Sequence, residues 1–132
     1  MTKQESERYY SSGSSIKKFR KDIMTLQYSV IHYTENGRDI FDDWLKTLKD
    51  KNGIISILRV IKRAEKGNFG EHRFCRDGVW ELVINTGPGY RVYYSMSEKT
   101  IILLLCAGSK RTQQKDIDKA VDFLKKYKEE HS

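Results

Sequence analysis

A carboxylate, an arginine and a tyrosine, Glu81, Arg91 and Tyr93, occupy alternate positions in two β-like segments that are joined by Gly87-Pro88-Gly89. The glycines and the proline indicate a tight turn, so the two segments are expected to pair as antiparallel strands. Because successive side chains of a strand point to opposite faces, these three polar side chains fall on the same face. A guanidinium, a carboxylate and a phenol on one surface are groups that can bind a phosphate and move protons.

Pairing across this turn assigns each side chain to a face of the sheet. It predicts three neighbour pairs: Asn85 with Arg91, Val83 with Tyr93, and Glu81 with Ser95. The face expected to pack under helices holds Trp80, Leu82, Ile84, Val92, Tyr94 and Met96. The other face, expected to be open, holds Glu81, Asn85, Arg91, Tyr93 and Ser95, and the loop 108–114 can bring Lys110 and Arg111 to its rim. Spacing alone fits equally well an ordinary cross-strand charge pair, Glu81 with Arg91, on a solvated face.

Charge points to a polyanion as the partner. The chain has 132 residues, enough for one domain, and carries 25 Lys and Arg against 18 Asp and Glu, a formal charge of +7. The excess is concentrated in residues 46–66 and in residues 1–24. Nucleic acid is therefore the leading class of partner.

Other classes of site find little support in the composition. Cys75 and Cys106 are too few for a disulfide framework and lack the clustered spacing of a zinc site, so we expect a reducing cytoplasm, no metal and no cofactor. No run of about 18 apolar residues is present, and the basic N-terminus is not followed by a signal-peptide core, so no membrane association is expected.

Hydrophobic periodicity predicts the elements that position these residues. A basic, loosely structured tail is expected over residues 1–23 and one domain over 24–132. The expected helices are Phe41–Leu48, capped by Asp39; a second one with Ile54, Ile57, Leu58, Ile61 and Ala64 on one face, ended by Gly67; and a C-terminal one with Ile117, Ala120, Val121, Leu124 and Tyr127 in a stripe. The expected strands lie at Leu26 to Tyr33, 79–86, 90–97 and 100–107, with a short one near Arg73 to Cys75. The order β-α-α-β-β-β-α predicts an α+β domain with a small, mainly antiparallel sheet.

Four segments resemble one known family of proteins. They are Gly67-Asn68-Phe69-Gly70, Gly78-Val79-Trp80-Glu81-Leu82, the stretch Gly87-Pro88-Gly89-Tyr90-Arg91-Val92-Tyr93-Tyr94, and Lys110 with Gln113 to Ile117. In this order they resemble the addiction-module killer proteins, the HigB-type branch of the RelE/ParE toxin superfamily. The resemblance extends from about Tyr28 to Tyr127. It implies a fold in which two N-terminal helices back the sheet, and a helix-turn-helix antitoxin as partner, with operator DNA bound only by the toxin–antitoxin complex.

The resemblance also implies an activity and assigns residues to it. RelE- and HigB-type members cleave messenger RNA in the ribosomal A site, whereas ParE-type relatives inhibit DNA gyrase, and the fold alone does not separate the two. Arg91 matches a catalytic arginine of the RelE-like enzymes, and Lys110 lies where they carry a second essential cation. Two positions depart from the pattern: Val83 stands where this branch has an arginine, and no tyrosine near Asp116 matches the C-terminal tyrosine of those enzymes. A gyrase inhibitor and an inactive, antitoxin-binding member therefore remain alternatives to a metal-independent endoribonuclease.

Metal-free RNA cleavage uses the 2′-hydroxyl as nucleophile, so the protein supplies cations for the phosphorane and groups for proton transfer. We expect Arg91 and Lys110 to be the cations, and Glu81, His72 and Tyr93 to be the candidates for proton transfer; Tyr93 could instead stack on a base. The remaining candidate RNA contacts are Arg73, Arg76 and Arg111, and Arg59, Lys62 and Arg63 of the second helix. For the second helix, an ordinary solubilising surface is an equally good interpretation.

Overall fold

A five-stranded sheet forms the centre of the protein in a computed structural model, whose described residues are 27–132. The strand order is β1-β7-β6-β5-β4, with β1 parallel to β7 and the other neighbours antiparallel. The strands are β1 (Ser29–His32), β4 (His72–Arg76), β5 (Val79–Ile84), β6 (Tyr90–Glu98) and β7 (Ile101–Ser109). A separate two-stranded ribbon, β2 (Thr34–Glu35) and β3 (Arg38–Asp39), follows β1.

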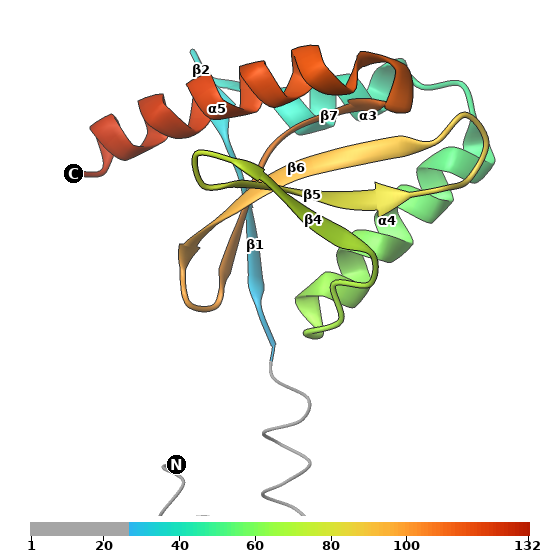
Figure 1. The fold of residues 1–132 in the computed structure, drawn as a ribbon, viewed down its shortest axis with the longest axis horizontal. Helices are drawn as coiled ribbons and strands as arrows, with labels where there is room; N and C mark the ends of the chain where they lie inside the picture. Colours follow the sequence, from blue (N-terminus) through green and yellow to red (C-terminus); the bar gives the residue numbers. More distant parts are fainter. Residues whose placement is uncertain (1–26) are drawn as a thin grey trace, which may run out of the picture.

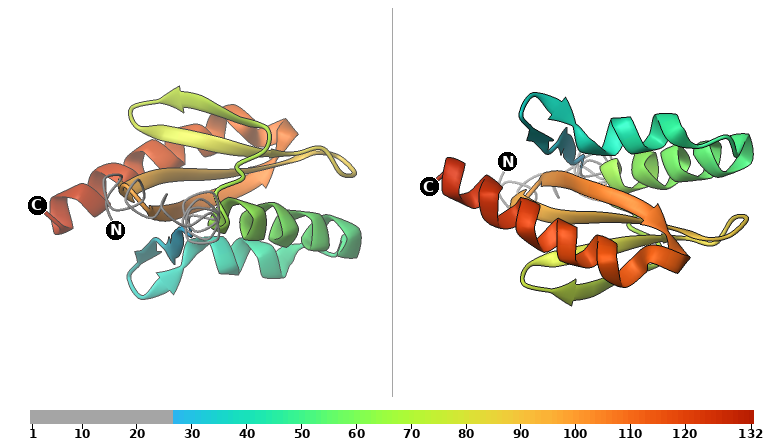
Figure 2. Two further views of the ribbon diagram at one scale, coloured as in Figure 1. Left: turned by 90° about the horizontal axis from the view of Figure 1, so that it is seen from below. Right: turned by 90° about the horizontal axis from the view of Figure 1, so that it is seen from above.

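Helices cover both faces of this sheet (Figure 1). Helices α3 (Ile40–Thr47) and α4 (Lys51–Glu65) lie on one face, and α5 (Gln113–Glu130), preceded by the short 3-10 turn η2 (Lys110–Thr112), crosses the other (Figure 2). Each face therefore has its own hydrophobic core. The core under α3 and α4 includes Phe41, Ile57, Leu82, Val92 and Leu104, and the core under α5 includes Tyr33, Val79, Tyr93, Leu105 and Leu124.

The two N-terminal helices form where the sequence predicts, with α3 one residue earlier than expected and α4 stopped as expected before Gly67. Asp39 caps α3 by accepting the Asp42 backbone N–H at 2.9 Å, and Asp50 caps α4 by accepting that of Gly53 at 3.0 Å. Helix α4 ends before Gly67, whose φ of +92° is readily adopted only by glycine. The predicted apolar face of α4 is wrong at one position, because Leu58 is 47% exposed.

Strand β7 is buried on both faces, as its unbroken apolar run predicts. Residues 102–108 are buried, and β7 lies inside the sheet between β1 and β6. The first strand is shorter than predicted, because only Ser29–His32 pairs with β7. The fold class is confirmed: a mixed α+β domain with a mostly antiparallel sheet.

The predicted register of the β5–β6 hairpin is wrong by two residues. Val83, not Asn85, pairs with Arg91, and Glu81 pairs with Tyr93. The connection is longer than the three residues assumed, since Asn85 to Gly89 all lie outside the strands and the Gly89 N–H donates to the Thr86 carbonyl at 3.0 Å. A shift by two keeps the alternation of side chains, so the residues within β5 and β6 stay on their predicted faces, whereas Asn85 belongs to the connection.

The prediction that one face of the sheet is open is also wrong. Helix α5 covers it, and Glu81, Arg91, Tyr93 and Ser95 are all buried. The apolar stripe of α5 needs a surface to pack on, and this is the face that α3 and α4 leave uncovered. The predicted tail, residues 1–23, lies outside the described residues. None of the helices in residues 27–132 combines the length and the apolar character that crossing a lipid bilayer requires.

Candidate functional site

A buried arginine and a buried glutamate meet beneath the first turn of α5. The Arg91 Nε lies 3.7 Å from Glu81 Oε2, and the two residues are 3% and 2% exposed. Gln113, the first residue of α5, donates from Nε2 to both Glu81 carboxylate oxygens, at 2.9 and 3.2 Å. Arg91 also donates from Nη1 to the Tyr90 carbonyl at 3.0 Å. Its Nε is buried without a hydrogen-bond partner among the described residues.

Lys110 lies beside Arg91 at the end of β7. Its backbone N–H donates to the Gly89 carbonyl at 3.0 Å, which joins η2 to the β5–β6 turn. A Cβ placed on Gly89 would lie 3.5 Å from the Lys110 Cβ and 3.8 Å from the Arg91 Nη1, so both residues flank this glycine. Lys110 and Arg111 are exposed. The structure therefore brings Lys110 next to Arg91, as the sequence predicts.

Arg73 completes this set of cations from the edge strand β4. Its side chain is 54% exposed, and its Nη1 lies 3.9 Å from Glu81 Oε2. Glu71 holds it by accepting from Arg73 Nη2 at 2.9 Å and also accepts from Asn85 Nδ2 at 3.0 Å. These two hydrogen bonds lower the pKa of the Glu71 carboxyl. We refer to Arg73, Glu81, Arg91, Lys110 and Gln113 together as the Arg91 cluster.

Tyr93 does not have the environment of a catalytic or stacking residue. It is completely buried, and its hydroxyl has no hydrogen-bond partner among the described residues. Burial, and secondarily the negative charges of Glu81 and Asp116, raise the pKa of its phenol far above the usual value of 10.0. The predicted stacking of a base on Tyr93 is wrong for this conformation, because no face of its ring reaches the surface.

His72 lies on the opposite face of the sheet from the Arg91 cluster. It pairs with Leu82 across the β4–β5 ladder, so it shares the face of Leu82, whereas its neighbour Arg73 shares that of Glu81. Its ring contacts those of Phe69 and Trp80, with centroids 5.9 and 5.8 Å away. The structure does not bring His72 to Arg91.

The other predicted RNA contacts are dispersed. Arg76 forms ion pairs with Asp77 and with Asp118 of α5. Arg59, Lys62 and Arg63 are exposed on α4, which packs on the face of the sheet opposite α5. They form a basic surface separate from the Arg91 cluster.

Sequence reasoning missed Gln113 and Glu71 as members or supports of this site. Gln113 lies in a segment that carries the family resemblance, and that resemblance is the signal that could have identified it. Its contact with Glu81 spans 32 residues of sequence, so no local sequence pattern predicts the contact. Nowhere in the described part of the chain do three or more His, Cys, Asp or Glu side chains gather so that they could hold a metal ion.

Comparison with known proteins assigns the chain to a family. Residues 43–125 match the model of the family described as phage-derived protein Gp49-like. The chain belongs to this family. The Gp49-like proteins lie within the RelE/ParE-like toxin superfamily, which makes a toxin of a toxin–antitoxin pair the general class and implies an antitoxin as partner.

One relative gives the extent of this similarity. An uncharacterized protein of Haemophilus influenzae is 45% identical to this chain over 80 residues, which is 61% of this chain and 81% of that protein. The residues that match the Gp49-like family model, 43–125, include every member of the Arg91 cluster.

Proposed function

We propose that this Gp49-like protein is a HigB-type toxin that cleaves messenger RNA on the ribosome without a metal. The observation that carries the proposal is the position of Lys110 and Arg91 on either side of Gly89, with Arg73 close to the same carboxylate as Arg91. Arg73 and Arg91 approach the same Glu81 oxygen, and Lys110 stands beside Arg91. Cationic residues gathered in this way suit a phosphodiester, because they can stabilise the extra negative charge of the phosphorane formed when the 2′-hydroxyl attacks.

The cations divide into exposed and buried groups. Lys110 and Arg73 are exposed and can contact a phosphate directly. Arg91 is 3% exposed and lies at the floor of the cluster. For its guanidinium to reach a phosphate, the surrounding groups have to shift, since the turn at Gly89 lies against Nη1 and Gln113 binds the Glu81 carboxylate that Arg91 approaches. Arg91 thus acts either directly after such a shift or by adding positive potential beneath the substrate.

Charge stabilisation is the main contribution we assign to the protein. Tyr93 is buried with a raised pKa, and His72 is on the other face. Glu81 contacts Arg91, but it is buried and its two oxygens are occupied by Gln113. Removing one donor that stabilises a developing negative charge typically costs about 100-fold or more in rate.

A non-enzymatic toxin is the second candidate, and the burial of Arg91 favours it. A buried arginine paired with a buried glutamate can be a purely structural feature. Val83 stands where this branch has an arginine, so the site lacks that cation, and the position itself is buried in the sheet at 6% exposure. The chain would then act by binding, either to DNA gyrase or to its antitoxin alone.

The test is cleavage of a defined messenger RNA in a reconstituted translation system, with transcript ends mapped at codon resolution. Lys110→Ala and Arg91→Lys should each reduce cleavage by about 100-fold. Lys125→Ala, on the exposed surface of α5, is the matched control and should cleave as the natural protein does. Intact messenger RNA, or equal cleavage by all variants, would overturn the proposal. Inhibition of gyrase supercoiling by the same preparation would establish the ParE-like alternative.

The partners follow from this function. We propose a helix-turn-helix antitoxin that neutralises the protein, messenger RNA and the ribosome as targets in the cytoplasm, and binding to operator DNA only as part of the complex with the antitoxin. Membership of the Gp49-like family is what implies an antitoxin partner. Co-purification of the protein with the product of the neighbouring gene tests this partner.

A further inference from the structure

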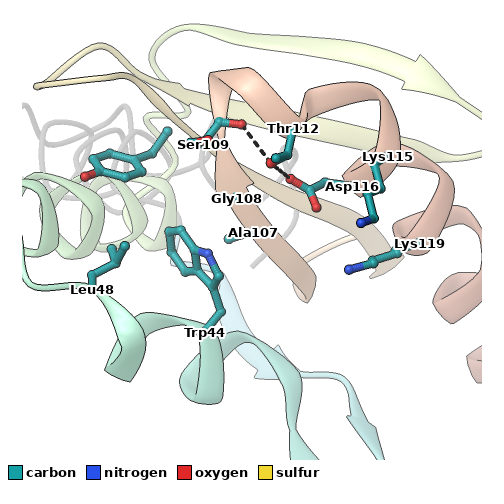
Figure 3. A pocket seen from close by; sticks show the side chains of 10 residues that line it. Trp44, Leu48, Ala107, Gly108, Ser109, Thr112, Lys115, Asp116 and Lys119 are labelled. Carbon is teal, nitrogen blue, oxygen red and sulfur yellow. Dashed lines mark hydrogen bonds between the residues drawn. The ribbon is translucent and has the colours of Figure 1, made fainter.

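A pocket next to the Arg91 cluster has the composition of a nucleotide site. It has a volume of about 400 Å³ and lies between the end of α3 and the start of α5, with Ala107 and Gly108 of β7 at its floor. Trp44 and Leu48 form one wall, and Thr112, Lys115, Asp116 and Lys119 form the facing one (Figure 3). Ser109 and Tyr90 complete the lining.

The lysines give this pocket a positive wall. Lys115 and Lys119 are one turn apart on α5, so their ammonium groups project on the same side of the helix. Within residues 27–132 neither forms an ion pair, whereas Lys126 of the same helix pairs with Glu35 and Asp122. Two exposed cations at this spacing, unpaired among the described residues, suit a phosphate, which accepts hydrogen bonds from both.

The opposite wall is aromatic and held in place. The ring of Trp44 packs edge-on against Tyr90, at a centroid distance of 6.0 Å, and lies 6.2 Å from that of Phe41. Trp44 is half-buried, so part of the indole remains available to the pocket. Stacking of a base on such a ring contributes about 1–3 kcal/mol in single-stranded nucleic-acid complexes.

Asp116 adds a fixed hydrogen-bond acceptor at the back of the pocket. It is 7% exposed, and one of its carboxylate oxygens accepts from the Thr112 hydroxyl at 2.5 Å while the other points toward the pocket (Figure 3). A carboxylate repels a phosphate but accepts from the amino or imino groups of a base. The base therefore belongs near Asp116 and Trp44, and the phosphate near the lysines.

We infer that this pocket binds one nucleotide of a single-stranded RNA, with the base against Trp44 and the phosphate between Lys115 and Lys119. The inference rests on the proposed function, because Ser109 and Thr112 of the pocket flank Lys110 and Arg111 in the chain, and Tyr90 precedes Arg91. An RNA whose backbone passes Lys110 can place an adjacent nucleotide here. The pocket is thus a positioning site beside the Arg91 cluster.

The test is binding of a 2′-O-methyl RNA hexanucleotide, which lacks the 2′-hydroxyl nucleophile and cannot be cleaved by the proposed mechanism. The full chain contains two tryptophans, Trp44 and Trp80, so Trp80→Phe leaves Trp44 as the only indole reporter. In this background, RNA should quench the tryptophan fluorescence in a saturable manner. Lys115→Ala with Lys119→Ala should weaken binding about tenfold and lower the slope of log K against log salt by about one. Lys125→Ala, farther along α5, should leave both unchanged.

Two results would overturn the inference. One is RNA binding, measured by anisotropy of a labelled oligonucleotide, without any change in Trp44 fluorescence. The other is quenching by the purified antitoxin but not by RNA, which would make the pocket a protein interface. Failure of the proposed function is separable: if the natural protein cleaves no RNA while the oligonucleotide still quenches Trp44, the nuclease proposal fails and the nucleotide site stands.

Discussion

Gln113 donates both of its short hydrogen bonds to a single carboxylate, that of Glu81, across 32 residues of sequence. This contact joins the first turn of α5 to the middle of the sheet. The Arg91 Nε lies 3.7 Å from the same carboxylate, too far for a hydrogen bond, so Glu81 is hydrogen-bonded to Gln113 and ion-paired with Arg91. The covering helix and the buried arginine are therefore linked through Glu81.

Gln113→Ala should destabilise the protein, because it removes the donor that satisfies a buried carboxylate. We expect a loss of about 1–3 kcal/mol in the free energy of unfolding, measured by urea denaturation. Gln114→Ala is the matched control, since Gln114 is the exposed neighbour and, within residues 27–132, donates only to Asp118 on the surface, at 3.3 Å. If both variants unfolded at the same urea concentration, the Glu81 contact would contribute no stability.

Faces of the sheet were predictable from sequence, whereas the register was not. Side chains in β5 and β6 alternate between the two faces of the sheet with a period of two residues, and this alternation is unaffected by where the turn closes. The pairing of Val83 with Arg91 depends on the five-residue connection, whose end is fixed by the Gly89–Thr86 hydrogen bond and by Thr86 donating to Ser56 of α4 at 2.9 Å. Contacts to a distant helix leave no local signal.

The covering of the second face was predictable in principle. The run from Ile101 to Leu105 predicts a strand buried on both sides, and two N-terminal helices cover only one side. The amphipathic C-terminal helix had to cover the other. Polar residues such as Glu81 and Arg91 suggested an open surface, but they lie under one end of α5, while Val79 and Leu105 on the same face form its apolar core. The local composition around the hairpin therefore misled the assignment of exposure.

Gly108→Ala should destabilise the protein through a direct clash with Asp116. A Cβ at Gly108 would lie 1.9 Å from Asp116 Oδ2 and 3.0 Å from the Thr112 hydroxyl, so the buried carboxylate must move. We expect a loss of about 1–3 kcal/mol in thermal or urea unfolding. Adding Asp116→Ala should restore part of that loss, because the clashing oxygen is removed. A double variant as unstable as the sum of the single variants would contradict this explanation.

The hydrogen bond between Tyr90 and Asp50 should make stability depend on acid pH. Tyr90 donates to Asp50 at 2.6 Å, and this bond, followed by the Gly53 N–H, lowers the pKa of the Asp50 carboxyl from 3.8. A lowered carboxyl pKa stabilises the folded state above pH 3.8, and the effect is lost as the pH falls through the pKa of the folded protein. Tyr90→Phe should therefore have a lower Tm than the natural protein at pH 7, and the difference should shrink as the pH falls from about 4 to about 2.

The control for this pH dependence is Tyr94→Phe. Tyr94 is also buried, but within residues 27–132 its hydroxyl makes no hydrogen bond with a carboxylate. Its effect on Tm should be the same at pH 7 and at low pH. A Tyr90→Phe difference that persisted unchanged to low pH would show that the lost contact is packing rather than the bond to Asp50.

Cys75 should react slowly with alkylating reagents although it is partly accessible. Burial, and to a smaller extent the neighbouring Glu81 carboxylate, raise the pKa of its thiol to about 11. Since only the thiolate reacts, alkylation by iodoacetamide at pH 8 should be roughly a hundredfold slower than for a free cysteine. Cys106 is buried, with a thiol pKa of about 12, and should react later still, so Cys106→Ser isolates the signal of Cys75. Glu81→Gln should speed the reaction of Cys75 by removing the nearby negative charge; an unchanged rate, with the fold intact by circular dichroism, would mean that burial alone protects this thiol.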